Sequence, residues 1–470
     1  MTQVLRGRRS AALARVAAAT AVCLVSGTVL APAASADPFT DGQWYVTPFK
    51  LVANHAIADG EGVTVALLDG MISPTAPNLA GADVVAAPTP CYSESGQRSS
   101  TGTGTAADHA TTMAAMIVGQ GGGTRPLGVA PGAKLLTYTI GFPDEENPFG
   151  LACYDKPGGT ASQSDTTAGD AIRDAVAKGA RIINMSYGGR NASAATQVAI
   201  QYAEQKGVVF VASTNDYDLQ AGQTRVIPPG SFNGVVLVNG IDRNAKLIAN
   251  SATGKPDGPL VVAAAPGEGL TLGGYDASGA YTTTQTSNGS SPATAFVSGV
   301  LATTLSKWPK ATGNQLIQSL ARNTGGEEHE IDARALDGYG YGVVSLTSML
   351  AHDPTAYPDE NPTLRDGAVP STGDILGSAT TSPSDSPAPS SSGAGSGSDV
   401  ASSSPQVAAT PASSEGGSSI GLIIGIVVGA VVLLALVALV VVLASRRGRR
   451  GGPPPPAPGP PSYAPGGYAR

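Results

Sequence analysis

The sequence has few of the residues on which many protein functions depend. Charged side chains make up 13% of the 470 residues, and the net charge is −7. Apart from the arginines that flank two apolar segments, basic residues do not cluster, which argues against nucleic acid as a partner. Cysteine occurs three times and histidine four times. The chemistry of an active site must therefore be sought among few candidates.

Two patterns of ligand-binding enzymes are also missing. The chain has no Gly-rich phosphate-binding turn, and no serine elbow that precedes an aspartate and a histidine. These absences argue against a small-ligand binder and against an α/β hydrolase. The acidic run Asp144, Glu145 and Glu146 offers oxygen ligands for calcium, but a solvated loop explains it more simply. We assign no metal site and expect no cofactor.

Residues 1–36 have the layout of a secretory signal peptide. Four arginines precede an apolar run that ends in the small residues Ala34-Ser35-Ala36, a typical cleavage site. The mature chain is expected to begin near Asp37. An uncut N-terminal anchor is the alternative, and both interpretations place the bulk of the chain on the outer side of a membrane.

A second apolar segment lies near the other end of the chain. Residues 420–444 contain only Ile, Leu, Val, Ala and Gly. As a helix they are long enough to cross about 30 Å of hydrocarbon. A cluster of four arginines follows directly, which favours the cytoplasmic side. The sequence predicts a single-pass cell-membrane protein with residues 445–470 inside; a buried core helix is the alternative.

The segments between these two markers differ in composition. Residues 356–418 are rich in Ser, Thr, Pro, Ala and Gly and are predicted to be a disordered linker, because they cannot bury enough apolar surface to fold. Residues 37–355 have the size of one α/β domain. The Pro-rich tail, 445–470, is either a ligand for a partner that reads polyproline segments or a disordered stub.

The cysteines favour one disulfide. Cys23 leaves with the signal peptide, so Cys91 and Cys153 remain as a pair in an oxidising compartment. A disulfide between them is the natural prediction, and two free thiols or a cysteine nucleophile are the alternatives.

Apolar runs of strand length alternate with helical patterns along residues 37–355, which predicts a mostly parallel central sheet flanked by helices. The expected strands are 63–69, 134–140, 181–187, 207–214, 234–240 and 260–266, and the clearest helices are 165–180 and 192–207. Ligands of such sheets gather at the carboxyl ends of the strands. Asp69 and Asn215 both follow predicted strands there.

Candidate catalytic residues occur in the order Asp, His, Ser. Asp69 ends the run VTVALLD, and His109 stands near the start of the small-residue helix TAADHATTMAAMIVG. The other three histidines lie in polar or peripheral segments, so His109 is the candidate general base. Each residue alone also has an ordinary structural explanation, a turn former for Asp69 and a helix-start residue for His109.

The segment NGSSPATAFVSG resembles the nucleophile motif of subtilases, with Gly289, Ser291, Ala293, Thr294, Val297 and Gly299 in register. The resemblance assigns the nucleophile to Ser291 and not to Ser290, although a serine at a helix start is often an N-cap. It also implies a subtilisin-like fold and an Asp69–His109–Ser291 triad that hydrolyses peptide bonds.

Two further segments carry the same resemblance. IINMSYGG is similar to the subtilase substrate-binding strand, in which Ser186, Tyr187 and Gly188 would offer their backbone to an extended peptide. VVFVASTND is similar to the strand that delivers the oxyanion asparagine, here Asn215. The implied partners are protein or peptide substrates.

The overall layout is similar to that of mycosins, the membrane-anchored subtilases of type VII secretion systems. The segment DGQWYVTPFKLVANHAIADGEGVTVALLD, with Trp44, and the segment LDGYGYGVVSLTSML carry this resemblance, together with the signal peptide and the single C-terminal span. It implies cleavage of secreted type VII substrates and a role with the membrane components of the secretion complex.

Three motifs depart from the usual subtilase pattern. This chain has Met71 after Asp69-Gly70, Ala110 after His109, and Pro292 after Ser291. Because a proline disfavours αR geometry in the preceding residue, Pro292 could turn the Ser291 hydroxyl away from His109. The rival hypothesis is a subtilase with little turnover that serves as a structural subunit of a membrane complex.

Overall fold

The computed structural model describes a large part of the predicted catalytic domain. The described residues are 37–143, 151–154, 156, 157, 159, 161–163, 165–187, 194–214, 228–249, 260–331 and 337–365. Within these ranges, no helix is both long enough and apolar enough to span a bilayer. The predicted signal peptide, the predicted span 420–444 and the tail 445–470 lie outside them.

A seven-stranded parallel sheet forms the centre of the domain. Its strands are β1 (Thr64–Asp69), β2 (Val84–Ala86), β3 (Lys134–Thr139), β7 (Ile182–Met185), β8 (Val209–Ser213), β9 (Val236–Ile241) and β10 (Val261–Pro266). They run in the order β10-β9-β8-β7-β1-β3-β2. All neighbouring pairs are parallel. The expected parallel α/β sheet is confirmed.

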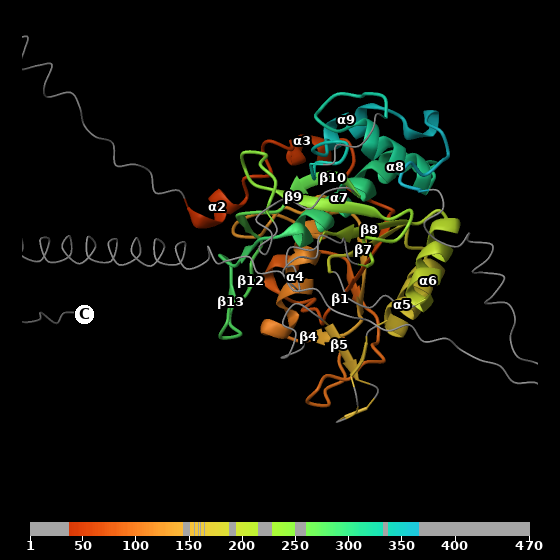
Figure 1. Ribbon diagram of the computed structural model, residues 1–470. Coiled ribbons are helices and arrows are strands. Elements are labelled where there is room, and N and C mark those ends of the chain that lie inside the picture. The colour runs from red at the N-terminus through yellow and green to blue at the C-terminus, as the bar shows by residue number, and fades with distance from the viewer. Residues whose placement is uncertain are drawn as a thin grey trace, which may run out of the picture. The chain divides into compact units, whose positions relative to one another are not determined.

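Helices cover both faces of this sheet (Figure 1). They are α2 (Pro38–Gly42), α3 (Leu51–His55), α4 (Thr105–Val118), α5 (Asp165–Ala177), α6 (Ala194–Gln205), α7 (Ser290–Lys307), α8 (Gly313–Arg322) and α9 (Leu346–Ala351), with the 3₁₀ turns η1 (Pro77–Leu79) and η2 (Pro354–Ala356). Leu67 points into the core shared with α4 and α7, whereas Leu68 points into the core shared with α5 and α6. Successive residues of a strand face opposite sides, so a strand buried on both faces must be apolar throughout.

Shorter strands lie outside the central sheet. An antiparallel sheet of β4 (Phe142–Pro143), β5 (Leu151–Tyr154) and β6 (Ala161–Gln163) follows β3. Two ribbons precede α7: β11 (Leu270–Thr271) pairs with β14 (Thr286–Ser287), and β12 (Gly274–Tyr275) pairs with β13 (Tyr281–Thr282). All of these segments come from loops in which the sequence predicted no element.

The first described residues are anchored on the domain. Tyr45 is fully buried, and its ring makes an edge contact with Phe296 of α7 at 6.1 Å. Its hydroxyl donates to the carbonyl of Leu127 at 2.9 Å. The indole N–H of Trp44 donates to the carbonyl of Glu268 at 3.0 Å. The segment before β1 that carries Trp44 and Tyr45 is therefore packed on the rest of the domain.

The predicted start of the disordered linker at residue 356 is too early. Gln318 Nε2 donates to the carbonyl of Glu360 at 2.8 Å, and Asn361 Nδ2 donates to the carbonyl of Gly234 at 2.9 Å. Arg365 donates from its backbone N–H to Asn233 at 2.7 Å. These polar side chains hold the segment without burying much apolar surface, which composition alone does not reveal. The domain extends at least to Arg365.

The sheet has a topological switch beside β1. From β1 the chain passes through β2 and then α4, which packs on one face, to β3, and from β3 it passes through α5, which packs on the other face, to β7. β1 therefore lies between β3 and β7, where the connections change from one face of the sheet to the other. Ligand sites of parallel sheets form at such points, and Asp69 is the last residue of β1.

Candidate active site

Asp69 is a buried carboxylate at the carboxyl end of β1. Its exposed fraction is 3%. The backbone N–H of Gly70 donates to Oδ1 at 2.6 Å, and His109 Nδ1 lies 3.0 Å from Oδ1 and 2.9 Å from Oδ2. A buried carboxylate is tolerated only when donors satisfy it, and these contacts supply them. The two residues come together from a strand and a helix 40 positions apart.

His109 stands in the second turn of α4 with half of its ring open to solvent; its side chain is 49% exposed, against 4% for Asp69. Because both facing oxygens are acceptors, the ring proton lies on Nδ1. Nε2 is then the basic nitrogen. This orientation is the one that a general base requires.

Ser291 lies in the first turn of α7, and a reciprocal pair of hydrogen bonds attaches it to the residue after β7. Its hydroxyl donates to the carbonyl of Ser186 at 2.8 Å, and the Ser186 hydroxyl donates to the carbonyl of Ser291 at 2.9 Å. Gly289, the N-cap of α7, has φ +126°, which favours glycine, and provides no side-chain cap. The first N–H groups of this buried helix are thus left without a side-chain acceptor at the N-cap.

The register of the sheet places these two pairs side by side. β1 and β7 are neighbours with Leu67 opposite Asn184, so Asp69 and Ser186 follow at equivalent levels. Neighbouring strands are about 4.8 Å apart. The Asp69–His109 pair and the Ser186–Ser291 pair therefore both lie at the carboxyl ends of these neighbouring strands.

The two adjacent serines have different environments. Ser290 is fully buried, and its hydroxyl donates to the carbonyl of Thr214 at 2.7 Å. Ser291 is partly exposed. A nucleophile has to reach a substrate, so Ser291 is the better placed of the two.

Two residues that the sequence did not single out support the serine. Asn184 donates from Nδ2 to the Ser186 hydroxyl at 2.9 Å, and the Ser298 hydroxyl donates to Asn184 Oδ1 at 2.9 Å. Asn184 and Ser298 are fully buried. A polar Asn inside the apolar run RIINM was the available signal, because a buried amide needs partners.

The three departures from the subtilase pattern have local packing partners. Met71 is 3% exposed and fills the space beside Gly102, where a Cβ would lie 2.6 Å from the Met71 sulfur. Ala110 packs in the main core on the sheet side of α4. Pro292 is buried within the first turn of α7, a position that proline tolerates because its missing N–H has no helical acceptor.

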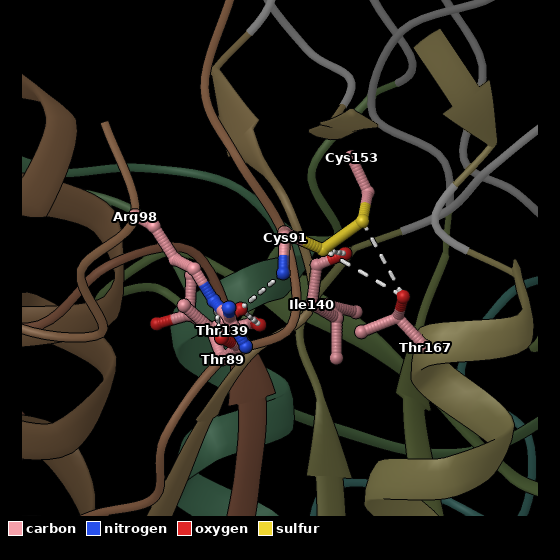
Figure 2. Close-up of a disulfide and its surroundings, with 7 residues drawn as sticks. All are labelled: Thr89, Cys91, Arg98, Thr139, Ile140, Cys153 and Thr167. Carbon is pink, nitrogen blue, oxygen red and sulfur yellow. Dashed lines mark hydrogen bonds between the residues drawn. A yellow bond between two sulfur atoms is a disulfide. The ribbon is translucent and has the colours of Figure 1, made fainter. Parts of the chain in front are cut away.

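A disulfide joins Cys91 and Cys153, and Ile140 and Thr167 lie next to it (Figure 2). Cys91 Sγ lies 3.5 Å from the carbonyl oxygen of Ile140, and Ile140 donates its backbone N–H to the carbonyl of Asp69 at 2.9 Å. The Thr89 hydroxyl donates to the carbonyl of Thr139 at 2.7 Å, which ties the same loop to the end of β3. The bridge therefore fixes the loops that frame Asp69.

The remaining predicted site residues are only partly described. Tyr187 is half-buried and packs on the core beneath α5 and α6. Gly188, the expected oxyanion residue Asn215 and the acidic run 144–146 lie outside the described residues. Within the described part of the chain, no group of three or more His, Cys, Asp or Glu side chains could hold a metal ion.

A histidine held by a buried aspartate and a serine at the start of a buried helix both lie at the carboxyl end of a parallel α/β sheet, and these are the residue types that a serine hydrolase uses. The subtilase family model matches residues 60–342. The chain therefore belongs to the subtilase family of serine endopeptidases.

Several known proteins are similar to the chain. Fervidolysin from Fervidobacterium pennivorans is 29% identical over 323 residues, which are 62% of this chain and 41% of that protein. Mycosin-1 from Mycolicibacterium smegmatis is 27% identical over 368 residues, 69% of this chain and 76% of that protein. The crystal structure of MycP1 from Mycobacterium smegmatis is 24% identical with a TM-score of 0.50, over 72% of this chain and 91% of that one. The solved structure supports the shared fold.

The chain spans less than half of fervidolysin, and 62% of the thermostable alkaline protease of Halalkalibacterium halodurans, which is 26% identical over 264 residues and 56% of this chain. The remaining parts of these two proteins have no counterpart in the matched part of this chain.

Proposed function

We propose that this chain is a serine endopeptidase that hydrolyses peptide bonds through Asp69, His109 and Ser291. The observation that carries the proposal is the contact of 2.9 Å between His109 Nδ1 and the buried carboxylate of Asp69. This contact supports a ring orientation with Nδ1 toward Asp69. The hydrogen bond of Ser291 to Ser186, which follows β7 at the level of Asp69 in β1, supports Ser291 as the nucleophile.

In the proposed mechanism, the Ser291 hydroxyl turns from the carbonyl of Ser186 toward His109 Nε2. Its oxygen attacks the carbonyl carbon of the scissile bond while Nε2 takes the proton. The carboxylate of Asp69 stabilises the imidazolium that forms. Collapse of the tetrahedral intermediate expels the amine, which takes the proton from Nε2. Water then attacks the ester carbonyl and gives a proton to Nε2. Collapse of this second intermediate releases the carboxylic acid product, and Nε2 returns the proton to the Ser291 oxygen.

The negative charge of the intermediate needs donors near Ser291. The backbone N–H of Ser291 is at the N-terminal end of α7, where the helix dipole also favours an anion. Pro292 contributes no N–H at its own position. Asn215 is the proposed second donor, and the bond from Ser290 to the carbonyl of Thr214 restrains the residue before it.

We further propose that the enzyme is exported and anchored in the cell membrane by residues 420–444, with residues 445–470 in the cytoplasm. The apolar segment and the arginines after it support this orientation. A link to type VII secretion is supported by the similarity to mycosin-1 and by a MycP1 structure described as part of the ESX-1 type VII secretion system, 22% identical with a TM-score of 0.51 over 68% of this chain and 88% of that one.

A second candidate function is a structural subunit of such a membrane complex with little turnover. The observation in its favour is the hydrogen bond that directs the Ser291 hydroxyl toward Ser186, since this bond must break before attack. The two candidates differ in whether Ser291 reacts with an electrophile.

A fluorophosphonate probe separates them when it is applied to the purified full-length protein. An active triad predicts labelling at Ser291 by peptide mapping, and loss of labelling in Ser291→Ala and His109→Ala. Ser290→Ala is the matched control, because it removes the neighbouring buried hydroxyl and should still carry the label at Ser291. Folded wild-type protein that does not react would favour the structural subunit.

The link to secretion has its own test. Cells that carry the Ser291→Ala variant should release the same proteins as wild-type cells but leave one or more of them uncleaved. Cells without the chain should lose cleavage and, if the chain also stabilises a complex, lose release. Identical secreted proteins in all three strains would contradict the link.

A further inference from the structure

The ribbon β12–β13 lies against the helix that carries His109. It belongs to the segment between β11 and β14 that leads directly into α7 and Ser291. β12 packs on α4 (Figure 1). The ribbon therefore contacts the helix of the base and is continuous in sequence with the nucleophile.

Asp108, the residue before His109, holds the base of this ribbon. Its Oδ1 accepts the backbone N–H of Tyr275 at 2.6 Å, and its Oδ2 accepts Gln285 Nε2 at 3.4 Å. Tyr275 is in β12 and Gln285 follows β13, so one carboxylate accepts hydrogen bonds from both sides of the ribbon. Gly274 leaves no room for a side chain, because a Cβ there would lie 2.2 Å from Asp108 Oδ1.

The charge of Asp108 is partly enclosed. Burial raises the pKa of its carboxyl, while the donors Tyr275 and Gln285 and the adjacent His109 act in the opposite direction. A carboxylate that faces two donors from one ribbon forms charge-assisted hydrogen bonds, which are stronger than neutral ones.

Further contacts keep the ribbon along the start of α4. The hydroxyl of Tyr275 donates to Ser73 Oγ at 2.7 Å, and the Tyr275 and Tyr281 rings meet edge to face at 5.8 Å. At the turn of the ribbon, a Cβ on Gly279 would lie 3.7 Å from the Cα of Gly104, the N-cap of α4. The ribbon thus follows α4 from its N-cap to the turn that carries His109.

The reaction chemistry indicates which part of a substrate would meet this ribbon. His109 gives its proton to the leaving amine, so the residues after the scissile bond leave past His109. The residues before the scissile bond lie toward Ser186 and Tyr187, the proposed backbone partners. We propose that Asp108 is a positioning residue that holds the β12–β13 ribbon as the wall of the substrate cleft on the leaving-group side. This inference rests on the proposed protease function.

The first test concerns the anchoring and needs no turnover. Amide hydrogen exchange is measured on the full-length protein for residues 272–285. Asp108→Ala should speed exchange in this segment roughly tenfold, the change expected when a hydrogen bond to a charged group is lost. Asp108→Asn keeps an acceptor for the Tyr275 N–H and should restore most of the protection. Unchanged exchange in Asp108→Ala would overturn the inference whether or not the protein is active.

The second test concerns the substrate. For each variant, kcat/KM is measured on a peptide p-nitroanilide, which has no residue after the scissile bond, and on a quenched fluorescent peptide with four residues there. Asp108→Ala should lower the ratio of long to short substrate by about tenfold, mainly through KM, and Asp108→Asn should recover it to within about threefold. Both the nitroanilide and the long peptide report the triad, but only the long peptide reports the ribbon.

The outcomes are distinguishable. If Asp108→Ala lowered kcat/KM equally on both substrates, the ratio of long to short substrate would not change. This result would contradict the proposal that the ribbon is a wall of the substrate cleft and would mean that Asp108 acts on His109 alone. Failure of wild-type protein to cleave either substrate would overturn the proposed protease function, and with it the substrate role of the ribbon. Tyr275→Pro removes the backbone donor and leaves the carboxylate in place, so it should lower the ratio as Asp108→Ala does.

Discussion

The proposed active site has two halves. In the acid–base half, His109 contacts the buried carboxylate of Asp69, whereas the nucleophile half, made of Ser291, Ser186, Asn184 and Ser298, is held by neutral hydrogen bonds. The acid–base half lies beside loops that a disulfide fixes, and the nucleophile half lies between the central sheet and a buried helix. Charge and a covalent bridge maintain one half, and packing with satisfied hydroxyls maintains the other. We therefore expect the acid–base half to be sensitive to changes of charge and of the disulfide, and the nucleophile half to be sensitive to the loss of buried neutral hydrogen bonds.

Asp69→Asn should have the largest effect on activity. The amide cannot hold His109 in the tautomer with an unprotonated Nε2, and the corresponding change in a trypsin-type triad lowers kcat by about 10⁴-fold. We expect a loss of about that size in kcat/KM and in the rate of fluorophosphonate labelling, with little change in the bonds of the nucleophile half. Asp174→Asn, on the outer surface of α5, is the matched carboxylate control. Retention of more than a tenth of the activity in Asp69→Asn would exclude the triad.

The double variant Cys91→Ala/Cys153→Ala should have the largest effect on stability. The two cysteines are 62 positions apart, and a cross-link over a loop of that length stabilises a fold by on the order of 4 kcal/mol in the chain-entropy account. Because Met71 and Ala107 share a cluster with the cysteines, activity should fall with stability. Denaturant unfolding of the full-length protein measures the loss.

A reducing agent gives the control for this variant. It should destabilise the wild-type protein and leave the double variant unchanged. Equal sensitivity of both proteins would show that the reductant acts elsewhere, and equal stability of both would remove the disulfide from the account of the acid–base half.

Asn184→Ala perturbs the nucleophile half without changing any charge. It leaves the buried hydroxyls of Ser186 and Ser298 without their shared partner, and we expect a loss of about 2 to 3 kcal/mol in the free energy of unfolding. Ser298→Ala removes one hydrogen bond and should cost about 1 kcal/mol. Because the network is neutral, both losses should be the same at pH 6 and pH 8. A loss that changes with pH would mean that the two halves are electrostatically coupled.

The elements that the sequence predicted well are those with long apolar patterns. β1 was expected at 63–69 and runs from Thr64 to Asp69, and α5 was expected at 165–180 and ends at Ala177. Such runs carry their own signal, because a strand buried on both faces has to be apolar throughout. The fold and the residues at the strand ends follow from them.

The parts that the sequence did not reveal depend on contacts between distant residues. The two-residue strands β12 and β13 are too short to show any periodicity, and Asp108 is 167 positions from Tyr275. The choice between Ser290 and Ser291 rested on a motif, whereas the structure separates them by burial and by partners. The linker boundary was misplaced because residues 359–365 are held by hydrogen bonds to distant residues of the folded domain, such as the bond from Asn361 to the carbonyl of Gly234.

The carboxyl of Glu204, outside the proposed site, also makes the free energy of unfolding depend on pH. It should be replaced before the variants of the two halves are compared at different pH values. Glu204 on α6 has an Oε1 that is buried and for which the described residues offer no hydrogen-bond partner, and burial raises its pKa to about 8 from an ordinary value of 4.5. Between these two values the unfolded chain ionises while the folded protein keeps the proton, so the folded state becomes relatively less stable as the pH rises, and above pH 8 the penalty is constant.

The free energy of unfolding of Glu204→Gln should therefore match that of the wild type at pH 4 and exceed it by about 1 to 2 kcal/mol at pH 8. One unit of pKa difference is worth about 1.4 kcal/mol, and solvent near a partly exposed side chain reduces the total. Unfolding curves from pH 4 to 9 test this, and a constant difference across that range would contradict the assignment.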